Sequence, residues 1–216
     1  MTTRIPWPDL GRNLVAILRG ITPDDAPGHV AALIELGFEA VEVPLNSPEP
    51  FTTIADLVRR FGTDSLIGAG TVLDPADCNR LADLGARFVV TPNTDPEVIR
   101  ASVGGGMITM PGVLTPSEAL LAWRSGASAL KVFPASVPGP DGIAAMCAVL
   151  PPDVPVGVVG GVSDITLPQY YAGNARIFGM STSLYRPGDD VATLRNKATR
   201  ILAAYEACRG GGGPGT

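Results

Sequence analysis

The feature of this 216-residue chain that most constrains its fold is a repeated order of predicted helix, glycine and apolar run. A glycine in this position is typical of a helix C-terminus, where a left-handed residue closes the last turn. The repeat therefore predicts a regular alternation of helices and strands. The six glycines that separate a helix from an apolar run are Gly37, Gly62, Gly85, Gly105, Gly126 and Gly173.

The apolar runs are continuous and do not alternate with polar residues, which is typical of parallel strands covered on both faces. Eight strands separated by helices predict an α/β fold, a single (β/α)8 TIM barrel. A doubly wound open sheet is the main rival, but no GxGxxG sequence follows the first strand, and the even repeat favours closure. The runs are 14–18, 40–43, 66–69, 88–90, 107–110, 130–132, 154–159 and 176–178.

Proline marks the predicted start of several helices, since its fixed φ suits the first helical position. We expect the last helix to cover about residues 189–208. The barrel is predicted to occupy residues 1–209 as one domain, and the Gly-rich residues 210–216 to form a flexible tail. The prolines that follow Thr, Ser or Asp at these starts are Pro23, Pro48, Pro75, Pro96 and Pro116.

The net charge of −5 offers no basic surface for nucleic acid. No stretch approaches the roughly 18 apolar residues of a membrane span, and the first residues lack the apolar core of a signal peptide. Cys78, Cys147 and Cys208 are far apart and form no CxxC, so we expect free thiols in a reducing compartment. These observations predict a cytoplasmic protein that binds neither nucleic acid nor membrane.

His29 is the only histidine, in a helix predicted to be exposed. A Ser-His-Asp triad, a histidine-rich metal site and a histidine general base are therefore nearly excluded. Proton transfer would have to use a carboxylate, a lysine, a tyrosine or water.

Lys131 is one of only two lysines and lies in the apolar run 127–135. Burial disfavours the charged form of a lysine, so its pKa should fall. A neutral amine is a nucleophile that forms Schiff bases with carbonyl compounds. The alternative is a lysine at a strand end that reaches water or pairs with a carboxylate.

Glu42 lies between Val41 and Val43 in another apolar run, where a carboxylate is costly unless it is paired or functional. A Schiff-base enzyme needs a proton shuttle near its lysine, and with no histidine available Glu42 is the best candidate. The alternative is a buried ion pair between Glu42 and Lys131 that only stabilises the barrel.

Two further features lie at strand ends. Gly160 and Gly161 follow the seventh strand and, with the loop after the eighth, match the usual phosphate site of these barrels; a tight turn without a ligand is the alternative. Arg19 follows the first strand and suits a carboxylate or phosphate, unless it is simply solvated. Since the reactive side chains of such barrels lie at the C-terminal strand ends, we expect the site among Arg19, Glu42, Thr71, Thr91, Pro92, Asn93, Pro111, Gly112, Lys131, Gly160, Gly161, Ser181 and Thr182.

Five segments together resemble the class I 2-keto-3-deoxy-6-phosphosugar aldolases of the KDPG and KHG type, in register over residues 12–206. The resemblance implies that Lys131 is the Schiff-base lysine, that Glu42 is the acid/base residue, and that neither a metal nor a cofactor is needed. It also implies a homotrimer. The segments are Val15–Ile21, Val41–Pro48, Ile67–Val72, Thr91–Asn93 and Leu130–Pro134. The implied substrate-binding residues are Arg19, Thr71, Asn46, Thr91, Pro92, Pro111 and Phe133, and the implied phosphate-binding residues are Gly160, Gly161, Gly179, Ser181 and Thr182.

The two branches of this family differ after the glutamate of the second strand. The gluconate-pathway branch typically reads Thr-Leu-Arg-Thr there, whereas this chain has Asn46 at the arginine position and an arginine at Arg19 instead. This exchange is similar to the galactonate-pathway branch. The resemblance thus implies cleavage of 2-dehydro-3-deoxy-6-phosphogalactonate, a small 2-keto-3-deoxy phosphosugar acid, to pyruvate and D-glyceraldehyde 3-phosphate. The chain departs from the family where Ser181 replaces the second glycine of Gly-x-Gly-Ser.

Several alternatives stay open at this point. In the first, the aldolase cleaves the 2-dehydro-3-deoxy-6-phosphogluconate epimer, or both epimers. In the second, the same barrel is a phosphosugar epimerase or isomerase, although such enzymes usually use acidic pairs, a metal or histidine. In the third, the barrel has no catalytic role and binds a sugar phosphate or a protein.

Overall fold

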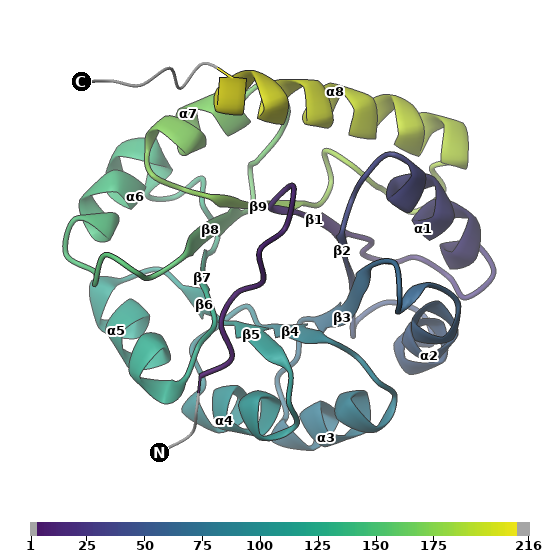
Figure 1. Ribbon diagram of the computed structural model, residues 1–216, viewed down its shortest axis with the longest axis horizontal. Coiled ribbons are helices and arrows are strands. Elements are labelled where there is room, and N and C mark those ends of the chain that lie inside the picture. Colours follow the sequence, from purple (N-terminus) through teal and green to yellow (C-terminus); the bar gives the residue numbers. More distant parts are fainter. Residues whose placement is uncertain (1–3, 211–216) are drawn as a thin grey trace.

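Parallel strands alternate with helices along residues 4–210, the part of the chain that the computed structural model describes. The strands form a ring and the helices surround it, which is the predicted (β/α)8 barrel (Figure 1). The strands are β1 (Leu14–Ile17), β2 (Ala40–Pro44), β3 (Leu66–Gly70), β4 (Phe88–Val90), β5 (Ile108–Met110), β6 (Gly112–Val113), β7 (Leu130–Val132), β8 (Val156–Val159) and β9 (Ile177–Met180). The helices are α1 (Ala26–Glu35), α2 (Pro50–Phe61), α3 (Pro75–Asp83), α4 (Pro96–Gly104), α5 (Pro116–Ser125), α6 (Gly139–Cys147), α7 (Leu167–Ala172) and α8 (Val191–Gly210).

The fifth predicted strand is divided into β5 and β6 by Pro111. β5 pairs with β4 and β6 pairs with β7, both in parallel. Proline has no N–H to donate to the ladder, but its carbonyl oxygen still accepts a hydrogen bond of 2.9 Å from the Lys131 N–H. The two segments therefore act as one strand. With β5 and β6 counted together, the nine short strands form the eight-stranded ring that the repeat predicts.

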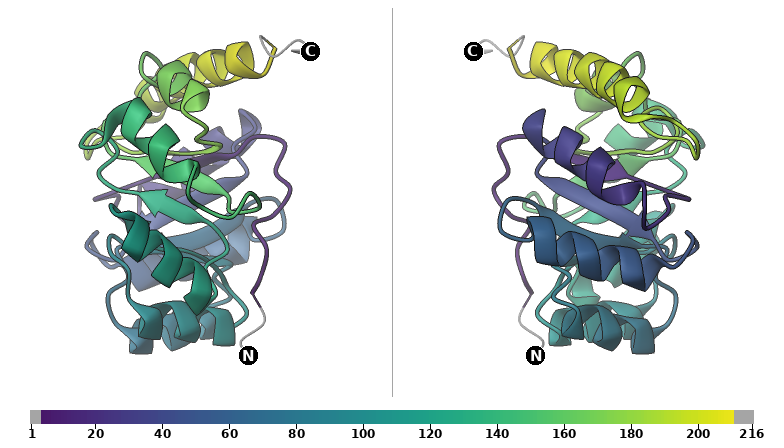
Figure 2. Two further views of the ribbon diagram at one scale, coloured as in Figure 1. Left: turned by 90° about the vertical axis from the view of Figure 1, so that its left-hand side faces the viewer. Right: turned by 90° about the vertical axis from the view of Figure 1, so that its right-hand side faces the viewer.

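Side chains of successive strand residues point alternately into the barrel and toward the helices. On β2, Val41 and Val43 belong to the large core between strands and helices, so Glu42 points inward. A smaller core fills the barrel itself. Ile5, Trp7 and Leu10 pack against this inner core, and Figures 1 and 2 show the segment before β1 crossing one end of the barrel. That end is closed, and the site lies at the other.

Half of the repeating glycines have the left-handed backbone predicted for a helix C-terminus. Gly37, Gly85 and Gly126 have φ of 90°, 80° and 111°. Gly62, Gly105 and Gly173 are helix C-caps as predicted, but their φ is negative; after α4 the left-handed residue is Gly106, with φ of 75°. Close packing explains two of these, because a Cβ on Gly62 would lie 2.6 Å from the Val58 carbonyl oxygen, and one on Gly173 would lie 2.7 Å from that of Pro140.

Three of the predicted proline starts are confirmed. Pro75, Pro96 and Pro116 open α3, α4 and α5, each after an N-cap side chain that accepts a backbone N–H: Asp74, Asp95 and Thr115. Pro23 and Pro48 instead lie in the loops before α1 and α2. None of the helices within residues 4–210 is long and apolar enough to cross a membrane.

Two expectations require correction, one about the C-terminal tail and one about His29. α8 continues to Gly210, so this glycine belongs to the helix and not to the tail; the remaining tail residues, 211–216, lie outside the described part of the chain. His29 is 5% exposed and not on an open helix face. The segment before α8 covers it, and its Nδ1 and Nε2 lie 2.8 Å from the carbonyl oxygens of Asp25 and Asp189.

Candidate active site

A cavity of about 400 Å³ opens at the C-terminal ends of the strands. It contains both ionisable residues that the apolar runs of the sequence singled out, Lys131 and Glu42. Most of the other predicted site residues lie along its wall. The full lining is Ile17, Arg19, Glu42, Thr71, Pro92, Lys131, Phe133, Val159, Gly160, Gly161, Val162, Gly179, Ser181 and Thr182.

Lys131 points into the barrel from the middle of β7. Its strand partners are Gly112 on β6 and Gly157 on β8, which have no side chains to compete for the space around it. Lys131 is 4% exposed, and its Nζ lies 4.6 Å from the centre of the Phe133 ring. Burial lowers the pKa of the amine from its usual value, the nearby Glu42 carboxyl opposes this shift, and Arg19 lowers the pKa further. The site thus favours a neutral, nucleophilic amine.

Glu42 points into the same space from β2 and is 1% exposed. Burial raises the pKa of its carboxyl, against the opposing effects of Lys131 and Arg19. The carboxyl fits because residue 70, on β3, is glycine: a Cβ there would overlap the Glu42 Oε1 atom.

The structure also bears on the alternative of a purely structural ion pair. No salt bridge joins Glu42 to Lys131 among the ion pairs of residues 4–210. A buried pair that only stabilised the barrel would need close contact to offset desolvation. The separation leaves space between the amine and the carboxyl, as a reaction site requires.

Arg19 extends from the end of β1 toward the loops after β2 and β3. Its Nη1 donates to the Asn46 Oδ1 atom at 2.5 Å, and both terminal nitrogens lie 3.4 Å from the Thr71 Oγ1 atom. Thr71 has φ of 57°, a left-handed backbone that is unusual for a β-branched residue and is found where the surrounding structure enforces it. This group of one guanidinium, one amide and one hydroxyl is suited to bind a carboxylate.

Two loops form another part of the wall. Gly160 and Gly161 follow β8 with φ of 89° and 83°. A Cβ on Gly161 would lie 2.9 Å from the Ser136 Cβ atom, so both backbone and packing favour glycine. Within residues 4–210, the backbone N–H groups of Gly161, Ser181 and Thr182 donate to no protein acceptor. Free N–H groups of residues that line a cavity are suited to bind an anion such as phosphate.

The chain is similar to known aldolases in sequence and in structure. The KDPG and KHG aldolase family model matches residues 11–192. A probable 2-dehydro-3-deoxy-6-phosphogalactonate aldolase of Rhizobium meliloti is 53% identical over 208 residues, which cover 96% of this chain and 98% of the relative. The 2-dehydro-3-deoxy-6-phosphogalactonate aldolase of Escherichia coli is 47% identical over 192 residues, or 89% of this chain and 94% of the relative.

The chain belongs to the KDPG and KHG aldolase family. A solved native KDPGal structure agrees, with a TM-score of 0.93 and 45% identity over 95% of this chain and 100% of that structure. The protein is therefore an aldolase, a lyase, as the sequence motifs predicted. Family membership favours this function over the epimerase, isomerase and non-catalytic alternatives.

Three residues predicted to bind substrate do not line the cavity of the aldolase. Asn46 is exposed and reaches the site only through Arg19. Thr91 is 1% exposed, and its hydroxyl donates to the Asn93 carbonyl and accepts from the Gly112 N–H, so it connects the loop after β4 to β6. Pro111 is buried within the divided fifth strand.

Conversely, three apolar residues that were not predicted from the sequence line the cavity. They are Ile17, Val159 and Val162. Ile17 and Val159 end β1 and β8 with their side chains inside the barrel, so strand alternation was the signal that could have found them.

Proposed function

We propose that the aldolase cleaves 2-dehydro-3-deoxy-6-phosphogalactonate to pyruvate and D-glyceraldehyde 3-phosphate through a Schiff base on Lys131. The observation that supports this most directly is the cavity itself. A buried amine and a separate buried carboxyl share it with a guanidinium group and two loops of free N–H groups. These are the groups that a phosphorylated 2-keto acid requires.

In this mechanism the neutral Lys131 amine adds to the C2 carbonyl, and loss of water gives an iminium. Glu42, through a water molecule, takes the proton of the C4 hydroxyl. The C3–C4 bond then breaks, its electrons move to the iminium as an enamine, and C4 leaves as the aldehyde of glyceraldehyde 3-phosphate. Protonation of C3 and hydrolysis of the imine release pyruvate and regenerate Lys131. The iminium is the electron sink, so the carbon–carbon bond breaks without a metal.

Substrate placement follows from the two ends of the cavity. Arg19 and Thr71 bind the carboxylate, and Asn46 orients the guanidinium through its hydrogen bond of 2.5 Å. Gly160, Gly161, Gly179, Ser181 and Thr182 surround the phosphate. Pro92 and Phe133 complete the wall between them.

The two C4 epimers provide the test of substrate choice. We expect a higher kcat/KM for the galactonate epimer than for the gluconate epimer, because the arginine lies at position 19 and not at position 46. Pyruvate release from both epimers is measured side by side. Equal or faster cleavage of the gluconate epimer would favour the alternative, a gluconate-type or dual-epimer aldolase. The homotrimer and the cytoplasmic location stay predictions.

The charges around Lys131 predict opposite effects of two substitutions on the pH dependence of imine formation. Glu42→Gln removes a charge that raises the pKa of Lys131, so the acid limb of the profile should move to lower pH. Arg19→Gln removes a charge that lowers this pKa, so the limb should move to higher pH. The measurement is the rate of pyruvate trapping by cyanoborohydride at saturating pyruvate. Arg195→Gln, on the exposed face of α8, is the control, and shifts in the same direction would contradict the assignment.

A further inference from the structure

The phosphate end of the cavity contains no positively charged lining residue. Its two loops contribute backbone N–H groups, hydroxyls and glycines. Arg19, one of the two cationic residues in the wall, is directed toward Asn46 and Thr71 on the other side. A phosphate monoester carries about −1.5 to −2 charges at neutral pH, and Ser181 replaces a family glycine here. A nearby cation would therefore strengthen this subsite.

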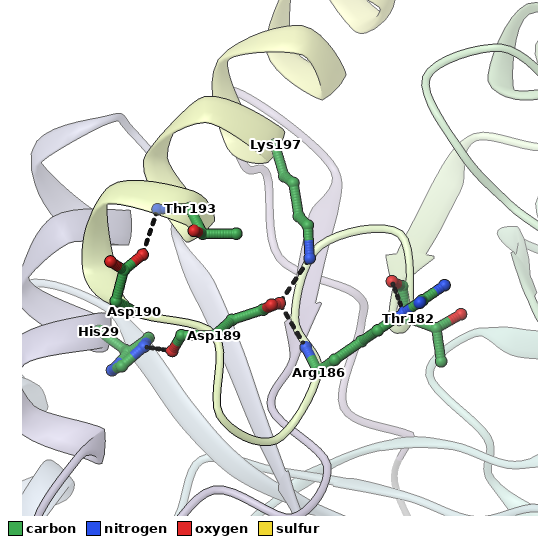
Figure 3. A network of polar contacts seen from close by, with 7 residues as sticks. All are labelled: His29, Thr182, Arg186, Asp189, Asp190, Thr193 and Lys197. Carbon is green, nitrogen blue, oxygen red and sulfur yellow. Dashed lines mark hydrogen bonds and ion pairs between the residues drawn. The ribbon is translucent and has the colours of Figure 1, made fainter.

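Arg186 provides a cation at this position. It lies in the loop between β9 and α8, and its Nε atom lies 3.3 Å from the carbonyl oxygen of Thr182, which lines the cavity. Figure 3 shows the side chain extending toward Thr182 and away from Asp189. Arg186 is exposed, and its contact with Thr182 places it next to a residue of the cavity lining, so its guanidinium is accessible to a ligand.

Asp189, a carboxylate of the same loop, has its pKa lowered by the hydrogen bond from Lys197 and also by the nearby Arg186 charge, but it forms no ion pair with this guanidinium. Asp189 accepts instead from the Lys197 Nζ atom of α8 and, at 2.8 Å, from the backbone N–H of Arg186 (Figure 3). None of the ion pairs formed by residues 4–210 includes Arg186. The Asp189 and Lys197 side chains are 18% and 20% exposed, so this pair is partly shielded from solvent.

The same contacts fix the loop to its neighbours. The carbonyl oxygen of Asp189 lies 2.8 Å from the Nε2 atom of buried His29 on α1. The adjoining Asp190 carboxylate accepts from the Thr193 N–H at the start of α8 (Figure 3). The segment that carries Arg186 is thus attached to two helices.

We propose that Arg186 binds the substrate phosphate, and that Asp189 and Lys197 are positioning residues for it. Lys197 neutralises Asp189, which leaves the Arg186 guanidinium for the ligand, while the Asp189 carboxylate holds the Arg186 backbone. The inference rests on the proposed function, since it places the phosphate of that substrate between the β8 and β9 loops. It assigns roles to residues outside the cavity lining.

Arg186→Gln is expected to raise KM for the phosphorylated substrate by about 10-fold or more, the effect of losing a charge-assisted hydrogen bond. The value of kcat should change by no more than about 3-fold, because the group acts far from the breaking bond. Cleavage of the unphosphorylated 2-keto-3-deoxy acid should not change. Arg195→Gln removes the same charge from an exposed arginine of α8 that pairs with Glu35, and should leave KM unaltered.

The positioning role has its own readout. Lys197→Met leaves the Asp189 carboxylate without its cation, so this carboxylate competes with the substrate phosphate for the Arg186 guanidinium. KM should therefore rise while kcat is unchanged. Lys197→Arg should restore KM. Adding Asp189→Asn to Lys197→Met should also lower KM again, because the competing charge is removed. A structural role alone would make that double variant the least stable and the least active, and this result would overturn the positioning role.

Titration of the full chain with inorganic phosphate separates this inference from the proposed function. We expect phosphate to bind the wild type and to bind Arg186→Gln at least about 10-fold more weakly, with Arg186→Lys in between. Equal phosphate affinity in the wild type and Arg186→Gln overturns the inference, whichever epimer is cleaved. If neither epimer is cleaved but the affinity difference is present, the proposed substrate fails and the phosphate role of Arg186 stands.

Discussion

Lys131→Met is expected to lower kcat/KM for aldol cleavage by roughly 10⁴-fold or more, the scale on which removal of a covalent nucleophile acts. Methionine fills much of the same volume but cannot add to a carbonyl. Because the buried amine is exchanged for an apolar group, the variant should fold at least as stably as the wild type. Thermal unfolding and circular dichroism check that the loss of activity is not a loss of structure.

Chemical trapping makes this prediction specific to one atom. With pyruvate and borohydride, the wild type should gain one stable adduct, and peptide mapping should place it on Lys131. Lys197, the only other lysine, is held by Asp189 and should remain unmodified in the same sample. Lys131→Arg keeps a positive charge but cannot form the imine and should gain no adduct. Near-normal cleavage by either Lys131 variant would exclude the Schiff-base mechanism.

Local signals in the sequence were sufficient to predict the barrel. Each strand is an apolar run of its own, and a glycine nearby in the chain precedes six of the eight strands. The division of the fifth strand also has a local cause, Pro111, which cannot donate to the ladder. Lys131 and Glu42 were identifiable because an ionisable side chain is costly to bury inside an apolar run. Such unfavourable placements are expected at functional sites.

The parts that could not be predicted depend on contacts between distant segments. The burial of His29 depends on the loop before α8, which lies across α1. Whether Thr91 faces the cavity depends on the close approach of the loop after β4 to Gly112 on β6. The role of Asp189 in holding Arg186 depends on the angle at which α8 presents Lys197. None of these arrangements has a signature within a single stretch of residues.

Glu42→Gln is expected to reduce kcat for cleavage by about 10²- to 10⁴-fold, the usual range for a general acid/base residue. The amide preserves the size of the side chain but cannot accept the C4 hydroxyl proton. Pyruvate trapping on Lys131 tests a separate step and should continue. The exchange of pyruvate methyl protons with solvent, which needs a base beside the enamine, should fall together with cleavage. If cleavage and proton exchange both continued at the wild-type rate in Glu42→Gln, Glu42 would not be the proton shuttle.

Gly70→Ala tests the same role without changing the chemistry of Glu42. Gly70 does not have a left-handed backbone, so alanine is allowed there, but its Cβ would overlap the Glu42 carboxyl. The carboxyl must move away from the cavity, and cleavage and methyl exchange should both fall, in the direction seen for Glu42→Gln. Combining Gly70→Ala with Glu42→Gln should add little, because residues that act through one group are not additive. A Gly70→Ala enzyme that folds and keeps full exchange would show that the position of this carboxyl is not critical.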